Sequence, residues 1–249
     1  MDTTRRIGDR VGLGSKPRDY VKESRFGHWF LGTYTWEHHV VERALKDLLR
    51  IMDRPDGRYA VVLDVGCGQG KAFHALTEHF HPERLIGVDV EPEAMADARA
   101  EAARHGLEVE LIEADAAATG LPDGSVDLVF CHQTLHHLAR QEETLREFQR
   151  VLKPGGVLLL AESTRAYIHS WVIRLLFRHP MHVQRTAEEY LALVRQAGFV
   201  CEERNVSYPY LWWSRAADFG LLETLHIRKP PPHGQREETL VNLVARKPD

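Results

Sequence analysis

The chain is poor in the features that mark secreted, membrane-spanning and disulfide-linked proteins. Its 249 residues include only three cysteines, which lie far apart and form no Cys-x-x-Cys pair. Neither a disulfide framework nor a cysteine metal knuckle is therefore indicated. No apolar run reaches the about 18 residues that a membrane-spanning helix needs, and residues 1–16 lack the apolar stretch of a secretory signal. These absences predict a cytoplasmic protein without a transmembrane segment.

An excess of basic residues is also missing. Lysine and arginine number 32 against 36 acidic residues, which gives a net charge of −4. Proteins that bind nucleic acids usually carry a basic surface that neutralises phosphates, so the composition argues against a nucleic-acid partner. With 43% hydrophobic and 27% charged residues, the composition is that of a globular protein.

Short β-rich runs alternate with helical patterns from residue 59 onward. Pro92 stands where a helix tolerates proline at its start, and Gly106 stands where a helix commonly ends. Strands that alternate with helices predict an α/β fold with a doubly wound, mostly parallel sheet. The expected strands are 59–65, 84–90, 107–112, 126–131 and 157–161, and the expected helices are 71–80, 92–106 and 144–152.

The segments around this core differ from it. Residues 1–58 are expected to form a tail and lid helices, with an aromatic cluster at 26–36. Residues 59–249 form the main domain, in which an apolar segment at about 164–185 is expected to be a cap insert. Further along, Thr186 and Glu189 form the pattern of a capping box. We expect a helix at 187–198, a strand at 199–208, a helix at 212–225 and a last strand at 240–245.

A glycine-rich turn follows the first expected strand. Asp64 precedes Gly66, Cys67, Gly68 and Gly70. Glycines between a strand and a helix let a ligand approach the backbone closely because no Cβ stands in the way. Such a turn alone is a weak signal, since plain tight turns have the same composition.

Three carboxylates at successive strand ends make the signal stronger. Asp64 ends the first strand, where it can receive an ammonium group. Asp89 ends the second, 21 residues after Gly68, where it can accept both hydroxyls of a ribose. Asp115 follows the third strand and can pair with an adenine amino group. S-adenosylmethionine carries all three groups, so it is the predicted cofactor.

Five motifs together resemble those of class I methyltransferases, in particular the ubiquinone and menaquinone biosynthesis methyltransferases. They are VVLDVGCGQG (61–70), GVDV (87–90), AD (114–115), LPDGSVDLV (121–129) and RVLKPGG (150–156), all within residues 59–163. The resemblance implies a seven-stranded sheet with an antiparallel last strand, and contacts to the methionine part of the cofactor near Cys131 and His132. The expected cofactor-binding residues are Asp64, Gly66, Cys67, Gly68, Gly70, Asp89, Val90, Asp115, Ala116, Cys131 and His132.

Histidines cluster after the fourth strand. His132 and His136 would lie one helical turn apart, but no carboxylate or thiolate in this motif completes a metal set, so no metal is predicted. Either these histidines are structural, or one of them is a general base. Some relatives with a Leu-His-His element use a histidine together with a carboxylate that closes the fifth strand. By that resemblance His136, His137 and Glu162 are the catalytic candidates.

The predicted reaction is methyl transfer to a small, apolar or aromatic molecule enclosed by the aromatic cluster and the insert. Positioning alone can drive such a reaction, and a base matters only if the acceptor must lose a proton. An NAD-dependent oxidoreductase is an alternative, but Gly70 comes too early for G-x-G-x-x-G. A non-catalytic cofactor-binding protein with the same fold is another. An RNA methyltransferase lacks support, because residues 131–134 are no Asn/Asp-Pro-Pro-Tyr tetrad. The acceptor atom, the substrate and the oligomeric state stay open.

Overall fold

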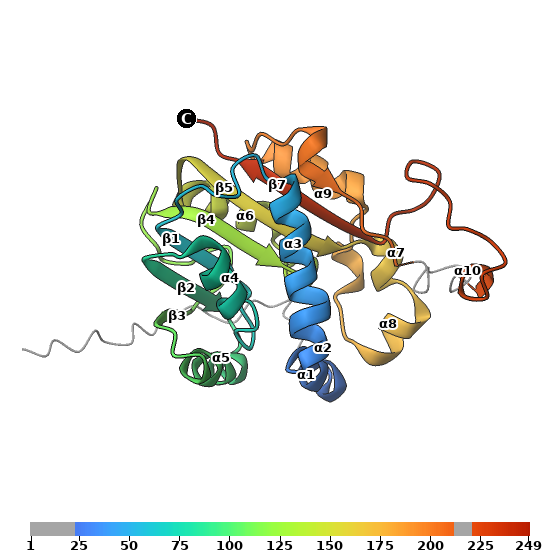
Figure 1. The fold of residues 1–249 in the computed structure, drawn as a ribbon, viewed down its shortest axis with the longest axis horizontal. Coiled ribbons are helices and arrows are strands. Elements are labelled where there is room, and N and C mark those ends of the chain that lie inside the picture. Colours follow the sequence, from blue (N-terminus) through green and yellow to red (C-terminus); the bar gives the residue numbers. More distant parts are fainter. Residues whose placement is uncertain (1–22, 212–220) are drawn as a thin grey trace, which may run out of the picture.

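A seven-stranded sheet organises the part of the chain that the structure describes (Figure 1). The computed structural model describes residues 23–211 and 221–249. The strand order is β3-β2-β1-β4-β5-β7-β6, and β7 runs antiparallel to β5, which confirms the predicted fold class and antiparallel last strand. The strands are β1 (Val61–Val65), β2 (Arg84–Asp89), β3 (Val109–Glu113), β4 (Val126–His132), β5 (Leu152–Ser163), β6 (Val206–Ser207) and β7 (Leu240–Arg246).

Helices cover both faces of this sheet. In Figure 1, α3 and α4 lie in front of the sheet and α6 lies behind it. The α-helices are α1 (Arg25–Leu31), α2 (Tyr34–Trp36), α3 (Glu42–Ile51), α4 (Phe73–Phe80), α5 (Pro92–Arg104), α6 (Gln141–Val151), α7 (Arg165–Ile168), α8 (Trp171–Leu176), α9 (Ala187–Gln196) and α10 (Leu221–Thr224). A π-helical turn, η1 (Glu37–Val41), joins α2 to α3, and 3-10 turns are η2 (Leu135–His137), η3 (Met181–Val183) and η4 (Glu203–Asn205).

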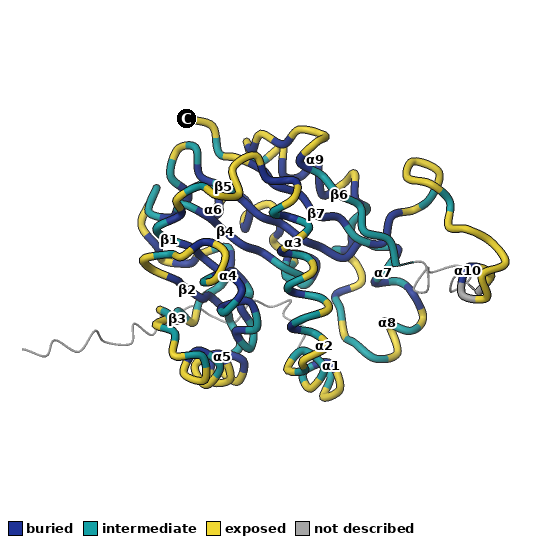
Figure 2. The backbone as a smooth tube through the Cα atoms, viewed as in Figure 1, coloured by how far each residue is buried: buried dark blue, intermediate teal, exposed yellow. Residues whose placement is uncertain are grey.

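Each face of the sheet has its own hydrophobic core. Val62 of β1 belongs to the core that also holds Leu45 of α3 and Phe73 of α4. The next residue, Leu63, belongs to the opposite core, together with Phe148 of α6. Successive side chains of a strand point to opposite faces, so a strand covered on both sides must be apolar throughout. The buried strands in Figure 2 therefore correspond to the continuous apolar runs of the sequence.

The N-terminal helices contact the insert that follows β5. The rings of Phe26 and Phe30 in α1 each lie 5.8 Å from the ring of Phe177. Ser24 caps α1 through the backbone N–H of Gly27, and its hydroxyl also donates to the carbonyl of Leu176. The proposed lid and the proposed cap insert therefore pack against each other, although they lie far apart in the sequence.

One expectation about the C-terminal part needs correction. Most of 199–208 is not a strand. Strand β6 is limited to Val206 and Ser207, Val200 forms an isolated bridge with Arg246 of β7, and η4 lies between them. The Asn205 amide donates to the carbonyl of Ile51 and to Asp53, which holds the backbone in a turn. Of the helix expected at 212–225, residues 212–220 lie outside the described part, and Leu221–Thr224 is helical. The capping box of Thr186 and Glu189 is present.

Across the described ranges, every helix is too short or too polar to cross a lipid bilayer.

Candidate active site

A cavity of about 580 Å³ opens at the carboxyl ends of the parallel strands. In doubly wound sheets, ligands bind where the strand order reverses, and here β1 lies between β2 and β4 at that point. The loops after β1, β2, β3 and β4 supply most of the wall. The cavity is lined by the predicted cofactor residues Asp64, Gly66, Cys67, Gly68, Asp89, Val90, Asp115, Ala116 and His132. Gly70 and Cys131 do not line it.

Asp64 is the deepest carboxylate of this wall. Its side chain is only 2% exposed, and Oδ2 has no hydrogen-bond partner among the described residues. Burial, with a smaller contribution from the charge of Asp89, raises the pKa of Asp64 to about 8. A buried acceptor without a partner is costly. A ligand ammonium group would supply both the missing donor and the missing charge, so the site fits the amino-acid part of S-adenosylmethionine.

The glycine turn brings the backbone close to this carboxylate. The N–H groups of Gly66 and Cys67 both donate to the carbonyl of Val88. Gly66 has a φ of +70°, and a Cβ there would lie 2.2 Å from the Thr134 hydroxyl oxygen. Gly70 is required for a different reason, because a Cβ would lie 2.6 Å from the ring of Phe73. Gly70 therefore allows helix packing and has no direct place in the cavity.

Asp89 is held rigidly at the end of β2. Oδ2 accepts the N–H of Gly68 and Oδ1 accepts the N–H of Glu91, both at 2.9 Å. Burial raises the pKa of Asp89, and these backbone N–H groups act in the opposite direction. Each carboxylate oxygen has two lone-pair sites, so Asp89 can still accept hydroxyls from the cavity side.

Asp115 has more neighbours than the sequence indicates. Oδ1 accepts the N–H of Ala117 at 2.8 Å, and Oδ2 forms an ion pair with Arg140. Arg140 also lines the cavity. This guanidinium was not among the predicted site residues, and the loop before α6 carries no motif that marks it.

The end of β4 forms the opposite wall. The ring of His132 stacks 5.9 Å from Phe130 and lies 5.6 Å from Trp36. Its buried Nε2 has no hydrogen-bond partner among the described residues. Burial lowers the pKa of His132 to about 3, with a smaller effect from His136, so the ring is neutral. Cys131 is fully buried beneath this wall, with its sulfur 3.9 Å from Glu162.

Glu162 contacts one of the two candidate histidines. Oε2 lies 2.6 Å from Nδ1 of His136, and Oε1 accepts the N–H groups of Thr134 and Leu135. His136 is buried and does not line the cavity, whereas His137 does. The predicted trio is thus divided. Glu162 and His136 form a buried pair, and His137 presents its side chain to the cavity.

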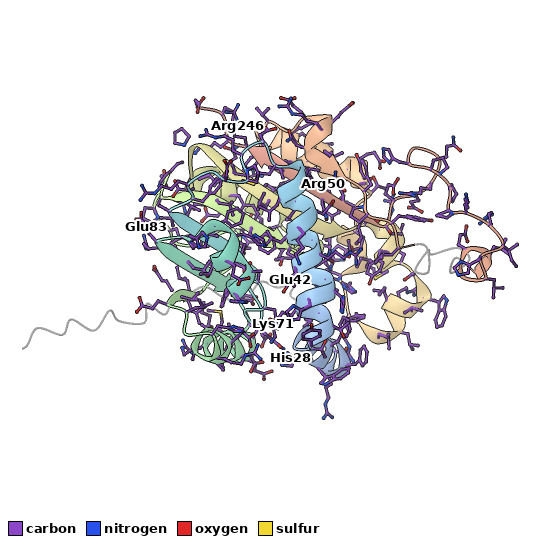
Figure 3. The ribbon with its side chains drawn as sticks, viewed as in Figure 1. His28, Glu42, Arg50, Lys71, Glu83 and Arg246 are labelled. Carbon is purple, nitrogen blue, oxygen red and sulfur yellow. The ribbon has the colours of Figure 1, made fainter. Side chains whose placement is uncertain are left out.

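The lid closes the remaining side. Gln69 of the glycine turn donates to the backbone carbonyl of His28 in α1 at 3.0 Å. Lys71 lies 3.3 Å from Glu37 and 3.1 Å from Glu101. Figure 3 shows His28 and Lys71 near the lower end of α3, and both line the cavity. The aromatic cluster in the sequence indicates such a lid, but the ionic contacts that fasten it depend on tertiary structure.

Comparisons with known proteins agree with this geometry. Residues 63–160 match a family model described as a methyltransferase domain. A demethylmenaquinone methyltransferase from Thermus thermophilus is 39% identical over 101 residues, which are 41% of this chain and 46% of that protein. The match therefore spans less than half of that relative's length.

Two solved structures share the fold. A methyltransferase from Aquifex aeolicus that depends on S-adenosylmethionine superposes with a TM-score of 0.61 at 19% identity, covering 88% of this chain and 96% of that one. The cyclase SpnF superposes with a TM-score of 0.58 at 21% identity, covering 83% and 81%. The family match confirms a methyltransferase domain at residues 63–160, and relatives named as dependent on S-adenosylmethionine confirm the predicted cofactor.

Proposed function

We propose that this chain, which carries a class I methyltransferase domain, transfers the methyl group of S-adenosylmethionine to a small apolar or aromatic molecule in the cytoplasm. The observation that carries the proposal is the buried carboxylate of Asp64, which lines the cavity and whose Oδ2 has no hydrogen-bond partner among the described residues. Asp64 would bind the ammonium group, Asp89 the ribose and Asp115 the adenine. When bound, the cofactor supplies a methyl group already activated on a sulfonium.

The apolar part of the cavity wall supports the proposal that the acceptor is lipophilic. Leu31, Trp36, Val41 and Phe130 line the cavity together with the carboxylates. Ligand sites commonly combine such walls with a few placed polar groups. The lid residues would exclude water and hold the acceptor in line with the methyl group, which by itself lowers the barrier.

The proton of a hydroxyl or ammonium acceptor would leave at the histidines after β4. His137 lines the cavity, and burial lowers its pKa well below the ordinary value, so its ring is neutral and would act only as a weak proton acceptor. His136 and Glu162 would position this turn. The residues that line the cavity would hold the acceptor's lone pair in line with the methyl group, and the bound cofactor would supply the sulfur as leaving group.

A non-catalytic or different activity on the same fold is the main alternative, since the cyclase SpnF shares the fold. Turnover separates these cases. The chain would be incubated with methyl-labelled S-adenosylmethionine and a panel of quinones, phenols and amines. Label should appear in a product from one of these classes, together with S-adenosylhomocysteine. Cofactor binding without transfer to any of them would favour the non-catalytic alternative.

An Asp64→Asn variant links the turnover to the site. The amide keeps the shape of the side chain but cannot neutralise an ammonium group, so binding should weaken by about tenfold to a hundredfold. Asp56→Asn, in an exposed turn before β1, is the matched control and should behave as the wild type. Equal activity of both variants would show that Asp64 does not receive the cofactor.

A further inference from the structure

We propose that His136, His137 and His179 bind a divalent late transition-metal ion, with Zn²⁺ as its representative, beside the cavity. One ligand nitrogen from each ring lies within 4.8 Å of those of the other two. The ring centroids are 4.2 Å apart for His136 and His137, 4.7 Å for His137 and His179, and 5.2 Å for His136 and His179. Three imidazoles with an open fourth position are the ligand set of a catalytic zinc site.

Glu162 contacts His136 in the way that an outer-shell carboxylate contacts a metal-binding histidine. Metal-binding histidines commonly place the ring nitrogen that does not bind the ion against a carboxylate, which fixes the ring's orientation and tautomer. Oε2 of Glu162 lies 2.6 Å from Nδ1 of His136. This contact leaves Nε2 as the nitrogen that His136 can offer to an ion. The carboxylate is fully buried and held by two backbone N–H groups, so it fixes the ring firmly.

Two glutamines hold the third histidine against this pair. His179 lies in the insert between α8 and η3, more than forty residues from His136 in the sequence. The amide of Gln184 donates to the carbonyls of His136 and Pro180, at 2.8 and 2.9 Å. The amide of Gln141 donates to the carbonyls of Leu135 and Val183, at 3.0 and 3.1 Å. The insert is therefore joined to the η2 turn through paired hydrogen bonds.

The position of His137 connects the site to the reaction, and this part rests on the proposed function. Because His137 also lines the cavity, the open position of an ion would face the acceptor. With the ion bound, a hydroxyl acceptor could take that position and release its proton to solvent in place of transfer to His137, since a bound cation lowers the pKa of such a ligand. The cluster would then favour acceptors with a hydroxyl group.

Titration of the full chain with Co²⁺ tests the site directly. After treatment with a chelator, the protein should bind one equivalent of Co²⁺, develop the visible absorption of a low-coordinate nitrogen site, and release Co²⁺ to Zn²⁺. His179→Ala should lower the affinity by about a hundredfold or more, and Glu162→Gln by about tenfold to a hundredfold. His182→Ala, an exposed histidine three residues further on, is the matched control and should bind as the wild type.

Two outcomes would overturn the proposal: no saturable binding of Co²⁺ or Zn²⁺ to the wild type, or equal affinities of the His179→Ala and His182→Ala variants. Binding of S-adenosylhomocysteine, measured on the same samples by calorimetry, shows that each variant is folded. Together with the methyl-transfer assay it also separates the two proposals, because loss of the metal should leave cofactor binding nearly unchanged, whereas failure of the proposed function would show as absent methyl transfer by a wild-type chain that still binds Co²⁺.

Discussion

The ionisation of Asp64 depends both on its burial and on the binding of a ligand. An ionised carboxylate that is buried without a partner is unfavourable, so the group responds by taking up a proton. Its pKa of about 8 means that Asp64, without a partner cation, is largely neutral at pH 7. A ligand ammonium group reverses this preference, because the ion pair is stable in a site that water does not reach.

The affinity for S-adenosylhomocysteine should therefore depend on pH. Below about pH 8, Asp64 must release a proton before it can pair with the ammonium group. Each unit of decreasing pH between 8 and 6 should raise the dissociation constant by up to about tenfold. Calorimetry across this range measures the effect, and Asp64→Asn should abolish the slope. A wild-type dissociation constant independent of pH would show that Asp64 does not ionise on binding.

Replacing Asp89 by Ala should weaken cofactor binding about a hundredfold or more. The substitution removes two charge-assisted hydrogen bonds to the ribose, each worth about 1.5–3 kcal/mol. Some loss will come from the turn, because Asp89 also accepts the N–H groups of Gly68 and Glu91. Fluorescence or calorimetric titration of Asp89→Ala beside Asp56→Ala gives the ratio. Similar constants for the two variants would remove Asp89 from the site.

The placement of single residues at the cavity was predictable from the sequence wherever it follows from strand ends. Asp64, Asp89 and Asp115 lie at or just after the ends of three strands, and parallel strands bring such positions to one edge. The sequence did not indicate that His136 contacts Glu162 while His137 lines the cavity, because this depends on the path of the backbone in the η2 turn. The approach of His179 depends on the path of the insert, which no local pattern specifies.

At the scale of elements, α1 and the insert stabilise each other through direct contacts. Phe177 contributes edge-on contacts to Phe26 and Phe30, and the N–H of Arg178 donates to Glu23. Both elements are short, and helices of this length gain their stability from packing. The lid over the cavity is therefore stable only as a pair.

Phe177→Ala should loosen α1 without unfolding the sheet. Aromatic pairs contribute about 0.5–1.5 kcal/mol each, so amide exchange in α1 should accelerate by about tenfold or more. The Michaelis constant for the acceptor should rise, while affinity for S-adenosylhomocysteine changes little. Hydrogen exchange read by mass spectrometry checks this against Leu175→Ala, a side chain that is 73% exposed. Equal exchange rates in the two variants would mean that Phe177 does not hold the lid.

Elements were predictable where periodicity and burial agree. The helix at Ala187–Gln196 begins where its capping box indicates. The fifth strand was expected to start at 157, but β5 begins at Leu152, with a register shift opposite Val126 and Leu128 that accommodates the Lys-Pro-Gly-Gly segment. A bulge of this kind is a property of strand pairing, which the sequence of one strand does not reveal.

At the scale of the whole molecule, the strand order explains why one edge carries all the chemistry. The strands β3-β2-β1 extend to one side and β4-β5 to the other, so the loops after β1 and β4 diverge and leave a crevice. The alternation of strands and helices predicted this architecture. It did not predict which side of the crevice the lid would close.

Calorimetric titration of the wild-type chain with S-adenosylhomocysteine and, separately, with NAD tests the central claim most directly. The cavity combines an unpaired carboxylate for an ammonium group with the ribose position of Asp89, and NAD has no ammonium group to offer. We expect saturable binding of S-adenosylhomocysteine with one site per chain and no measurable binding of NAD. Tight binding of NAD, with none of S-adenosylhomocysteine, would contradict the assignment of the site.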